Sequence, residues 1–302
     1  MRFSVIVIGN KWLAGGLAYL YLVIAPLCWA ANVVLARGVV HLISPVSFAF
    51  WRWLMAFLIL LPFTWSHVRQ DWKTATQHWK IMAVLSILGI SCFNTLLYSA
   101  VHTTTAINVA LIQTAMPAMI ILISRLFFYE RIRKIQFIGV LCCIVGACLV
   151  VLRGNIYTFL RLSFVKGDLL MITAVFLYAL YCVLLRKRPT MHSMSLLTYT
   201  FGLGVLGLLP LYVWETATLG RLVFTWKTAQ SILFVAVFPS IVAYFCWNRG
   251  IELIGANRAG LFINLVPVFA SIMAIIWLNE SLELFHIAGM TLIFCGMILF
   301  NR

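Results

Sequence analysis

The sequence predicts an all-α integral membrane protein in which ten transmembrane helices form two inverted five-helix repeats, with both termini in the cytoplasm. Three observations lead to this prediction: a composition too apolar for a water-soluble surface, apolar stretches that recur at the length of a membrane span, and a residue pattern that returns 150 positions later. The lipid bilayer is therefore the expected partner of most of the surface.

The composition identifies the solvent. Hydrophobic residues make up 64% of the 302 residues and charged residues only 10%, and the mean hydropathy is +1.06. Soluble domains carry about 25% charged residues, so this chain cannot cover its surface for water. Apolar stretches of roughly 20 residues cross hydrocarbon as helices. They predict ten spans: 17–37, 46–66, 79–99, 104–126, 134–152, 168–187, 195–214, 228–248, 258–278 and 284–301.

The net charge of +15 is explained by topology. With the N-terminus placed inside, the expected cytoplasmic segments hold 15 of the 22 Lys and Arg residues and the outer segments hold seven. This bias is the positive-inside pattern, and it predicts cytoplasmic termini in a multi-pass protein of the cell inner membrane. Nucleic acid is not an expected partner.

The internal repeat joins rare residues at one offset. Pro117, Glu130, Gly139 and Gly146 return 150 positions later as Pro267, Glu280, Gly289 and Gly296. We expect a first five-helix repeat over 1–152, a linker over 153–167 and a second repeat over 168–302. Five spans is an odd number, so the second repeat enters the membrane inverted, and a substrate site is expected near the midplane between the repeats.

The pattern of Pro, then Glu, then two Gly seven apart resembles the repeat end of the drug/metabolite transporter superfamily, EamA type. Trp29-Ala30-x-Asn32 and Arg52 between Trp51 and Trp53 also resemble the first repeat of that family. The resemblance covers nearly the whole chain. It implies ten helices with both ends inside and a transport function, but no particular cargo, because members move amino acids, drugs and other metabolites.

Polar residues within the spans form the candidate substrate site, because polar side chains in hydrocarbon face the bundle interior or a water-filled cavity. Residues three or four apart share one helix face, and several are matched between the repeats, including Asn94 with Tyr244 and Tyr98 with Asn248. The alternative is ordinary hydrogen bonding between helices, worth about 0.6 kcal/mol each. The candidate lining residues are Trp29, Asn32, Ser91, Asn94, Tyr98, Tyr178, Tyr181, Tyr244, Trp247 and Asn248.

Three prolines are candidate hinges. Pro117 and Pro267 lie within spans, and each leaves the carbonyl four residues earlier without its donor. Those carbonyls lie beside polar side chains, which adds Gln113 and Asn264 to the candidate site. Pro239 matches Gly89 at the same offset, so spans three and eight are expected to bend there. The alternative is a static kink satisfied locally.

Arg52 is the one basic residue clearly inside an apolar run. One reading is that it extends its guanidinium outward to the interface. The other is that it faces an outer vestibule and attracts a carboxylate or phosphate of the cargo.

The matched glutamates and glycines are expected to be structural. Glu130 and Glu280 lie at span ends, where each could cap the N-terminus of the following helix; a structural role is favoured over proton coupling. The glycine pairs, seven apart, allow close approach of helix backbones.

No catalytic group, metal site or cofactor is predicted. The eight cysteines lie inside spans without metal-ligand spacing, the six histidines scatter near span ends, and no carboxylate is expected at mid-membrane. A membrane-embedded enzyme would need such a constellation.

The sequence therefore predicts a secondary transporter, monomeric or weakly dimeric, that moves small polar or aromatic metabolites by alternating access. Amino acids are the best single class and export is favoured over uptake. The alternative is an importer of a nucleoside-like metabolite such as S-adenosylmethionine.

Overall fold

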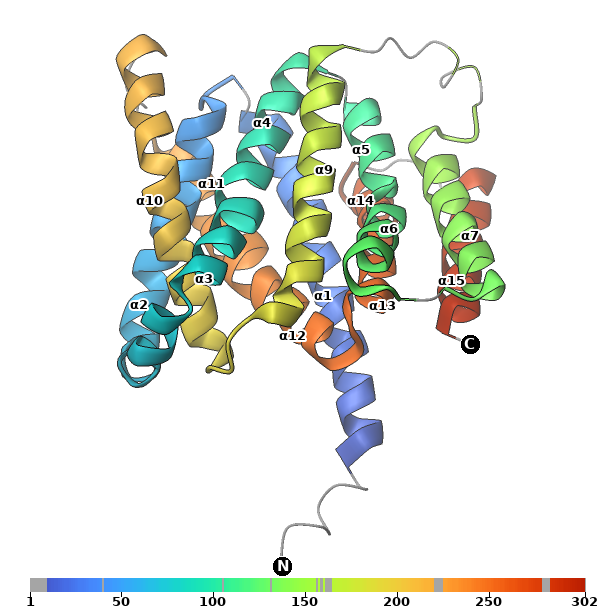
Figure 1. The fold of residues 1–302 in the computed structure, drawn as a ribbon. Helices are drawn as coiled ribbons and strands as arrows, with labels where there is room; N and C mark the ends of the chain where they lie inside the picture. The colour runs from blue at the N-terminus through green and yellow to red at the C-terminus, as the bar shows by residue number, and fades with distance from the viewer. Residues whose placement is uncertain are drawn as a thin grey trace, which may run out of the picture.

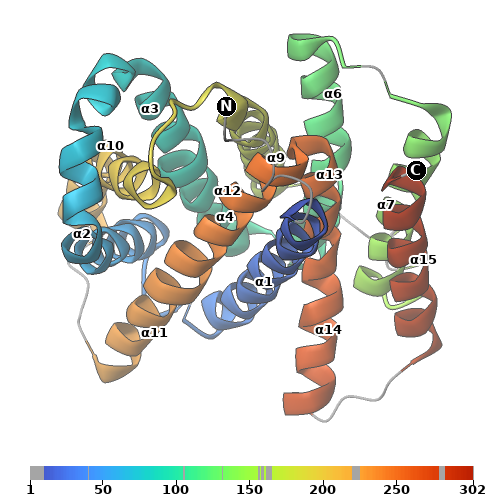
Figure 2. The same cartoon turned by 90° about the horizontal axis from the view of Figure 1, so that it is seen from below.

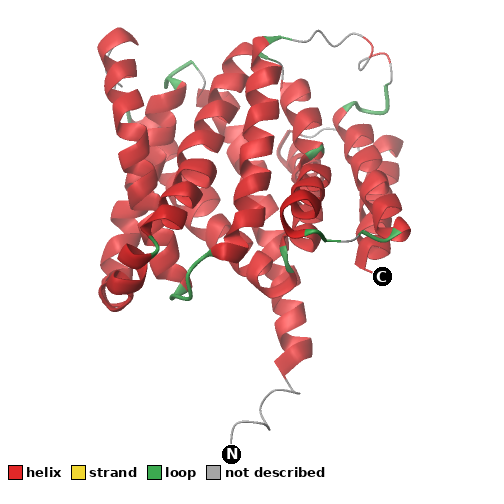
Figure 3. Ribbon diagram, viewed as in Figure 1, coloured by secondary structure: helices red, strands yellow, loops and turns green. Residues whose placement is uncertain are grey.

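The computed structural model describes residues 10–39, 41–104, 106–130, 132–155, 157, 160, 165–219, 225–278 and 283–301. Within these residues the regular structure is helical and contains no strand (Figure 3). A helix satisfies its backbone N–H and C=O groups internally, as a chain this apolar requires where water is absent, and helices accordingly follow one another almost without interruption.

The first half contains two long unbroken helices and then several broken ones. The breaks are short: a π-helical turn, η1, interrupts the third span, and a single residue, Ala115, separates α5 from α6. The elements are α1 (Asn10–Val39), α2 (Pro45–Gln77), α3 (Trp79–Ser86), η1 (Ile87–Cys92), α4 (Phe93–Thr103), α5 (Ala106–Thr114), α6 (Met116–Phe128) and α7 (Lys134–Val151).

The second half repeats this order. A π-helical turn, η3, again interrupts its third span, and a 3₁₀ turn, η4, interrupts its fourth. The elements are α9 (Lys166–Leu184), η2 (Leu185–Lys187), α10 (Ser193–Leu219), α11 (Trp226–Ala236), η3 (Val237–Val242), α12 (Ala243–Ile254), α13 (Ala256–Gly260), η4 (Leu261–Asn264), α14 (Leu265–Leu278) and α15 (Leu284–Asn301).

Among the described residues, eight helical segments are long and apolar enough to cross a membrane. Two of the predicted spans, 104–126 and 284–301, correspond to shorter apolar helices. Several helices exceed their predicted spans, as α2 does, because hydropathy marks the lipid-facing length whereas a helix can continue into the aqueous boundary.

The two halves run in opposite directions. The segment from α3 to α4 rises through the bundle in Figure 1, while the matched segment from α11 to α12 descends. α1 begins and α15 ends toward the lower end in that view, here called the N-terminal end. Which end faces the cytoplasm stays a prediction from the charge count.

The matched glycines join the two repeats directly. α7 packs along α15 beside the rest of the bundle (Figure 2). A Cβ on Gly146 would lie 2.6 Å from the carbonyl oxygen of Gly289, and one on Gly139 would lie 2.7 Å from that of Gly296. No larger residue fits so close an approach, which is the packing role expected of these glycines.

Candidate substrate-binding site

Arg52 is buried, with 1% of its surface exposed, and it joins the two halves. Its Nε donates to Ser240 Oγ at 2.6 Å, and one terminal nitrogen donates to the Pro239 carbonyl at 3.0 Å. The other terminal nitrogen donates to Asn94 Oδ1 at 3.0 Å and to the Tyr98 hydroxyl at 2.7 Å. The reading in which Arg52 reaches outward to the interface is therefore wrong: four partners in the interior hold it.

A matched pair of Tyr–Asn hydrogen bonds lies near this arginine. The Tyr98 hydroxyl donates to Asn32 Oδ1 at 3.3 Å, linking α4 to α1. In the second half the Tyr181 hydroxyl donates to Asn248 Oδ1 at 2.7 Å, linking α9 to α12. Tyrosine and asparagine have exchanged helices between the repeats, as the sequence match indicates.

The two π-helical turns expose backbone carbonyls that the opposite half uses. The Gly89 carbonyl in η1 accepts the Tyr244 hydroxyl at 2.6 Å. The Pro239 carbonyl in η3 accepts Trp29 Nε1 at 3.1 Å as well as Arg52. A π turn displaces the regular i→i−4 ladder, so both predicted bends are present, and each anchors a side chain from the other repeat.

Pro239 also explains the position of Ser240. Because Pro239 has no N–H, the carbonyl of Val235 loses its helical donor. The Ser240 hydroxyl donates to that carbonyl at 2.7 Å, which leaves its oxygen lone pairs to accept from Arg52. The proline thus fixes one of the partners that hold the arginine.

A central chamber lies between the halves beside this network. Three of its aromatic rings meet nearly edge to face: Trp29 lies 6.0 Å from both Tyr178 and Tyr244 by ring centroids, and those two tyrosines are 6.3 Å apart. Amides contribute the polar part of the wall. The lining residues are Trp29, Asn32, Val33, Phe93, Asn94, Leu97, Gln113, Met116, Tyr178, Tyr244 and Ile263.

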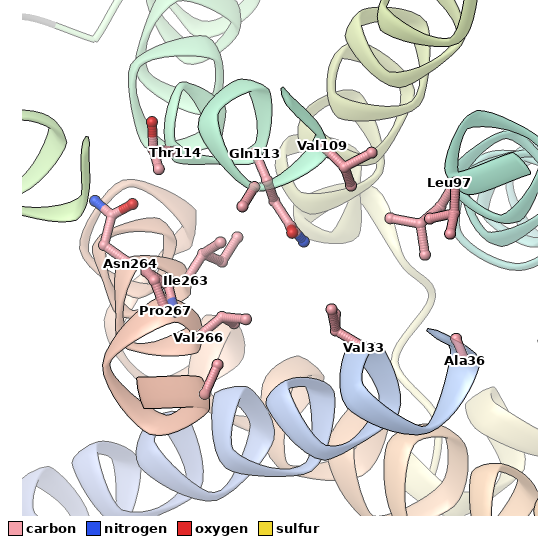
Figure 4. Close-up of a pocket in the computed structure, with 13 residues that line it drawn as sticks. Val33, Ala36, Leu97, Val109, Gln113, Thr114, Ile263, Asn264, Val266 and Pro267 are labelled. Carbon is pink, nitrogen blue, oxygen red and sulfur yellow. The ribbon is translucent and has the colours of Figure 1, made fainter. Parts of the chain in front are cut away.

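A second pocket adjoins the chamber and shares Val33, Leu97, Gln113 and Ile263 with it (Figure 4). It lies between α1, α4, α5 and α14, and the Gln113 side chain extends into it from α5. Its other lining residues are Ala36, Val101, Val109, Ala110, Thr114, Asn264, Val266, Pro267 and Ala270.

The route continues away from the N-terminal end. A third pocket shares Ala36 and Val101 with the second and reaches Ile43, in the turn after α1, and His102, in the last turn of α4. The two described pockets at the N-terminal end share no lining residue with the chamber.

The chamber is small in this structure. Measured as room for the centres of water-sized spheres, it holds about 30 Å³ and the second pocket about 80 Å³. A single water needs roughly 10–15 Å³ by the same measure. The structure therefore shows a contracted site, which must widen to hold a metabolite.

The predicted site residues divide into two groups. Trp29, Asn32, Asn94, Tyr178 and Tyr244 line the chamber, Gln113 lines both cavities and Asn264 lines the second pocket. The others lie outside the chamber wall: Arg52 behind Asn94, Tyr98 at the third pocket, Ser91 bonded to the Gly204 carbonyl, Trp247 bonded to Cys182, and the Tyr181–Asn248 pair.

The prolines occupy helix starts and turns more than helix interiors. α5 ends at Thr114 and α6 begins at Met116, so Pro117 lies in the first turn of a new helix, where its missing N–H costs nothing. Pro267 is the third residue of α14, directly after η4. The helix of this span therefore breaks at Ala115, two residues before Pro117, and does not bend within one continuous helix; hinge motion at the three prolines stays a prediction.

Glu130 has a different partner from the one expected. It forms an ion pair with Arg186 and accepts a hydrogen bond from Asn257, both in the second half. The start of α7 is capped by Gln136, whose side chain accepts from the Arg133 N–H at 3.0 Å. Glu130 therefore fastens the halves at the N-terminal end and is not the helix cap. Its mate, Glu280, lies outside the described residues.

Sequence reasoning missed Glu215, a buried carboxylate near the end of α10. It accepts from Ser44 Oγ at 2.6 Å, and from the N–H and hydroxyl of Ser47, both at 2.7 Å. Glu215 thus caps α2 from another helix. The signal was present: a lone acid one residue past the predicted span 195–214, and a Ser-Pro pair directly before the predicted span 46–66.

The fold and the chamber define a class, that of multi-pass membrane proteins whose two repeats enclose a central site. The chain belongs to the EamA-like transporter family, whose profile matches residues 16–152 and again 165–302. It is therefore an EamA-type membrane transporter, in agreement with the resemblance carried by the repeat motif.

Relatives and a solved structure agree with this assignment. The chain is 31% identical over 269 residues to the Bacillus subtilis (strain 168) protein named "Uncharacterized transporter YyaM", covering 87% of each chain. An "Uncharacterized transporter" of Archaeoglobus fulgidus is 26% identical over 93% of this chain and 96% of its own. A solved crystal structure with 16% identity superposes with a TM-score of 0.72 over 93% of this chain and 95% of that one, so it shares the fold.

Proposed function

We propose that this transporter moves small metabolites with an apolar body and a polar head, amino acids first among them, across the inner membrane by alternating access and in the direction of export. The observation that supports this most is the chamber between the repeats, where aromatic rings and side-chain amides share one wall. Aromatic walls suit an apolar body, and a few placed polar groups suit the head of such a cargo.

The arrangement of cavities supports alternating access. Pockets lead from the chamber toward the end opposite the N-terminus, while Glu130 fastens the two halves at the N-terminal end. In a protein built from inverted repeats, each half can adopt the shape of the other. Such an exchange would open the N-terminal end and close the opposite end. The transporter acts as a monomer or weak homodimer in this proposal.

Flux measurements in proteoliposomes test the proposal. The purified protein is reconstituted, loaded with a mixture of unlabelled amino acids, and tested for uptake of labelled phenylalanine, leucine and S-adenosylmethionine by counterflow. Counterflow of an amino acid supports the proposal. Flux of S-adenosylmethionine alone favours the importer, and no flux of any solute by correctly folded protein contradicts transport of these cargoes.

Variants locate the site in the same assay. Trp29→Ala, Asn94→Ala and Tyr244→Ala each remove part of the chamber wall, and each is expected to reduce flux at least tenfold. Ser86→Ala is the matched control, since Ser86 is buried on the same span as Asn94 but bonds only the Met82 carbonyl in its own helix. Normal flux in all three chamber variants would show that the site lies elsewhere.

A further inference from the structure

Arg52 is a buried cation whose described partners are all uncharged. Its donors meet a serine hydroxyl, an asparagine oxygen, a tyrosine hydroxyl and a backbone carbonyl. The three ion pairs found among the described residues involve other arginines, Arg186, Arg188 and Arg249. A buried charge without a counterion is costly, so a positive charge of this kind favours an anionic group in the space nearest to it.

The arginine also fixes which way the Asn94 amide faces. A guanidinium has only N–H donors, so the Asn94 oxygen must face Arg52 and its NH2 group must face away. That NH2 group donates to the Tyr244 hydroxyl at 3.3 Å, and one of its two N–H bonds is enough for this contact. Asn94 also lines the chamber. Its second N–H is therefore available to a ligand.

Asn32 is oriented in the same sense through Tyr98. The Tyr98 hydroxyl accepts from Arg52, so its own proton points to another acceptor, Asn32 Oδ1. The Asn32 oxygen is thereby occupied by the protein, and the NH2 group is the part of this chamber-lining side chain left for a ligand. Arg52 thus orients the side-chain amides of Asn32 and Asn94 so that both present their N–H donors to the chamber.

The hydroxyl and indole groups of the chamber do not reverse this polarity. The Tyr244 hydroxyl donates to the Gly89 carbonyl, and Trp29 Nε1 donates to the Pro239 carbonyl. The Tyr178 hydroxyl is buried and has no hydrogen-bond partner among the described residues, so its proton is a further donor for a ligand. No Asp or Glu is among the residues that line the chamber.

From this geometry we infer that the chamber recognises its cargo by a carboxylate, held by the N–H groups of Asn32 and Asn94 in the positive field of Arg52. Charge-assisted hydrogen bonds to a carboxylate are about twice as strong as neutral ones. The apolar body of the cargo then extends past Gln113 into the second pocket. This inference rests on the proposed function and narrows its substrate class to carboxylic acids, zwitterions included.

Binding of ligand pairs that differ only in the carboxylate tests the inference. Isothermal titration calorimetry on the full-length protein in detergent compares phenylalanine with phenylalaninamide, leucine with leucinamide, and 3-phenylpropionate with 3-phenylpropionamide. We expect each acid to bind at least about tenfold more tightly than its amide. Equal binding of acid and amide, or no binding of any acid, overturns the inference.

Asn94→Asp is the sharpest variant, because it keeps the shape of the side chain, replaces the NH2 group by an acceptor and gives Arg52 a counterion. It is expected to lower the affinity for the acids roughly tenfold or more and to abolish their advantage over the amides. Asn32→Asp makes the same change on α1 and replaces it if Asn94→Asp fails to fold. Ser86→Ala is the control and should keep the wild-type ratio. If folded Asn94→Asp, or Asn32→Asp in its place, binds the acids as the wild type does, the inference is overturned.

The proteoliposome assay separates this inference from the proposed function. Flux of a solute without a carboxylate, such as an amide or an amine, would leave transport standing and overturn carboxylate recognition. Folded protein that moves none of the tested solutes would contradict both.

Discussion

The two Tyr–Asn hydrogen bonds of this transporter occupy matched positions in its halves but have different neighbours. The Tyr98–Asn32 bond lies under Arg52, and its asparagine lines the chamber. The Tyr181–Asn248 bond lies near the Trp247–Cys182 contact, and neither of its members lines the chamber. Duplication has kept the hydrogen bond, while only one copy contributes a residue to the chamber wall.

The difference comes from one residue. At offsets of 149 and 150, the positions that answer Arg52 are Phe201 and Gly202, so the second half has no matching cation. Phe201 packs against Trp53 and Tyr244 instead. The repeat thus specifies the scaffold, whereas the proposed recognition of a carboxylate depends on a residue at which the halves differ.

Substitution of Arg52 should have the largest effect on stability and flux, because it removes the residue that distinguishes the two halves. Arg52→Leu strands several buried acceptors in both halves, and we expect a loss of roughly 2–5 kcal/mol in the free energy of unfolding together with loss of flux. Arg69→Leu on the exposed face of the same helix is the control and should stay within about 0.5 kcal/mol. Unfolding titrations in mixed micelles measure both. Equal stability of the two variants would mean that Arg52 is not the element that sets the halves apart.

The glycine contact should behave in the opposite way, because here the halves are equivalent. Gly146→Val and Gly289→Val each drive a side chain into the backbone of the partner helix, and we expect similar losses of roughly 1–3 kcal/mol. Gly16→Val is the control, since nothing lies within 4 Å of its Cβ position. Unfolding titrations would contradict the equivalence if one of the paired variants were neutral.

Tyr98→Phe and Tyr181→Phe test the asymmetry with the same small deletion. Tyr181→Phe removes one hydrogen bond between helices, worth about 0.6 kcal/mol of stability. Tyr98→Phe removes two, the one to Asn32 and the one from Arg52, so it should cost more stability. Only Tyr98→Phe releases Asn32 from its orientation, so only this variant should weaken cargo binding, by roughly three- to tenfold. Titration calorimetry with the preferred acid gives the ratio. If Tyr181→Phe weakened binding as much, the second bond would also serve the cargo.

The smallest effect is expected at the N-terminal end. Glu130 pairs across the halves with Arg186, whereas Glu252 pairs with Arg188 and Arg249 inside the second half. Partly exposed ion pairs are worth about 0.2–1 kcal/mol. Glu130→Gln should therefore raise the reactivity of an Ile254→Cys probe toward an impermeant maleimide by up to about fivefold, in a background without other cysteines. Glu252→Gln should raise the reactivity of the probe less than Glu130→Gln does. A larger rise with Glu252→Gln would show that the Glu130–Arg186 pair is not the contact that holds the halves together at this end.

Much of the architecture followed from the sequence because it depends on periodic or compositional signals. The apolar stretches predicted membrane helices, and the Pro–Glu–Gly–Gly repeat predicted the family and a packing role for the glycines, although not that α7 and α15 are the helices that meet. The match of Gly89 with Pro239 indicated the bends at η1 and η3. Each of these features is a local pattern of residues, or the recurrence of such a pattern, so it can be recognised in a single sequence.

What the sequence did not disclose depends on partners distant in the chain. The Arg52 side chain points inward because it bonds to Ser240 and the Pro239 carbonyl. No periodic pattern in the sequence connects these two residues with Arg52. The polar stripes predicted one cavity lined by Asn94 and Tyr244 from both halves, but not that Tyr181, Trp247 and Asn248 would lie outside the chamber wall. Glu130 was assigned to the following helix because the nearest helix start is visible in sequence, while Arg186 is not.

The contact between α7 and α15 has a consequence for biosynthesis. The glycines that meet across it are far apart in the chain, so α7 enters the membrane long before the ribosome has made its partner. Until α15 follows, the grooved face of α7 that holds Gly139 and Gly146 stays uncovered. Helix association in a bilayer depends on such close packing, so this contact between the repeats forms only after α15 has been inserted. A chain cut short before α15 would thus present an open groove to quality control in the membrane.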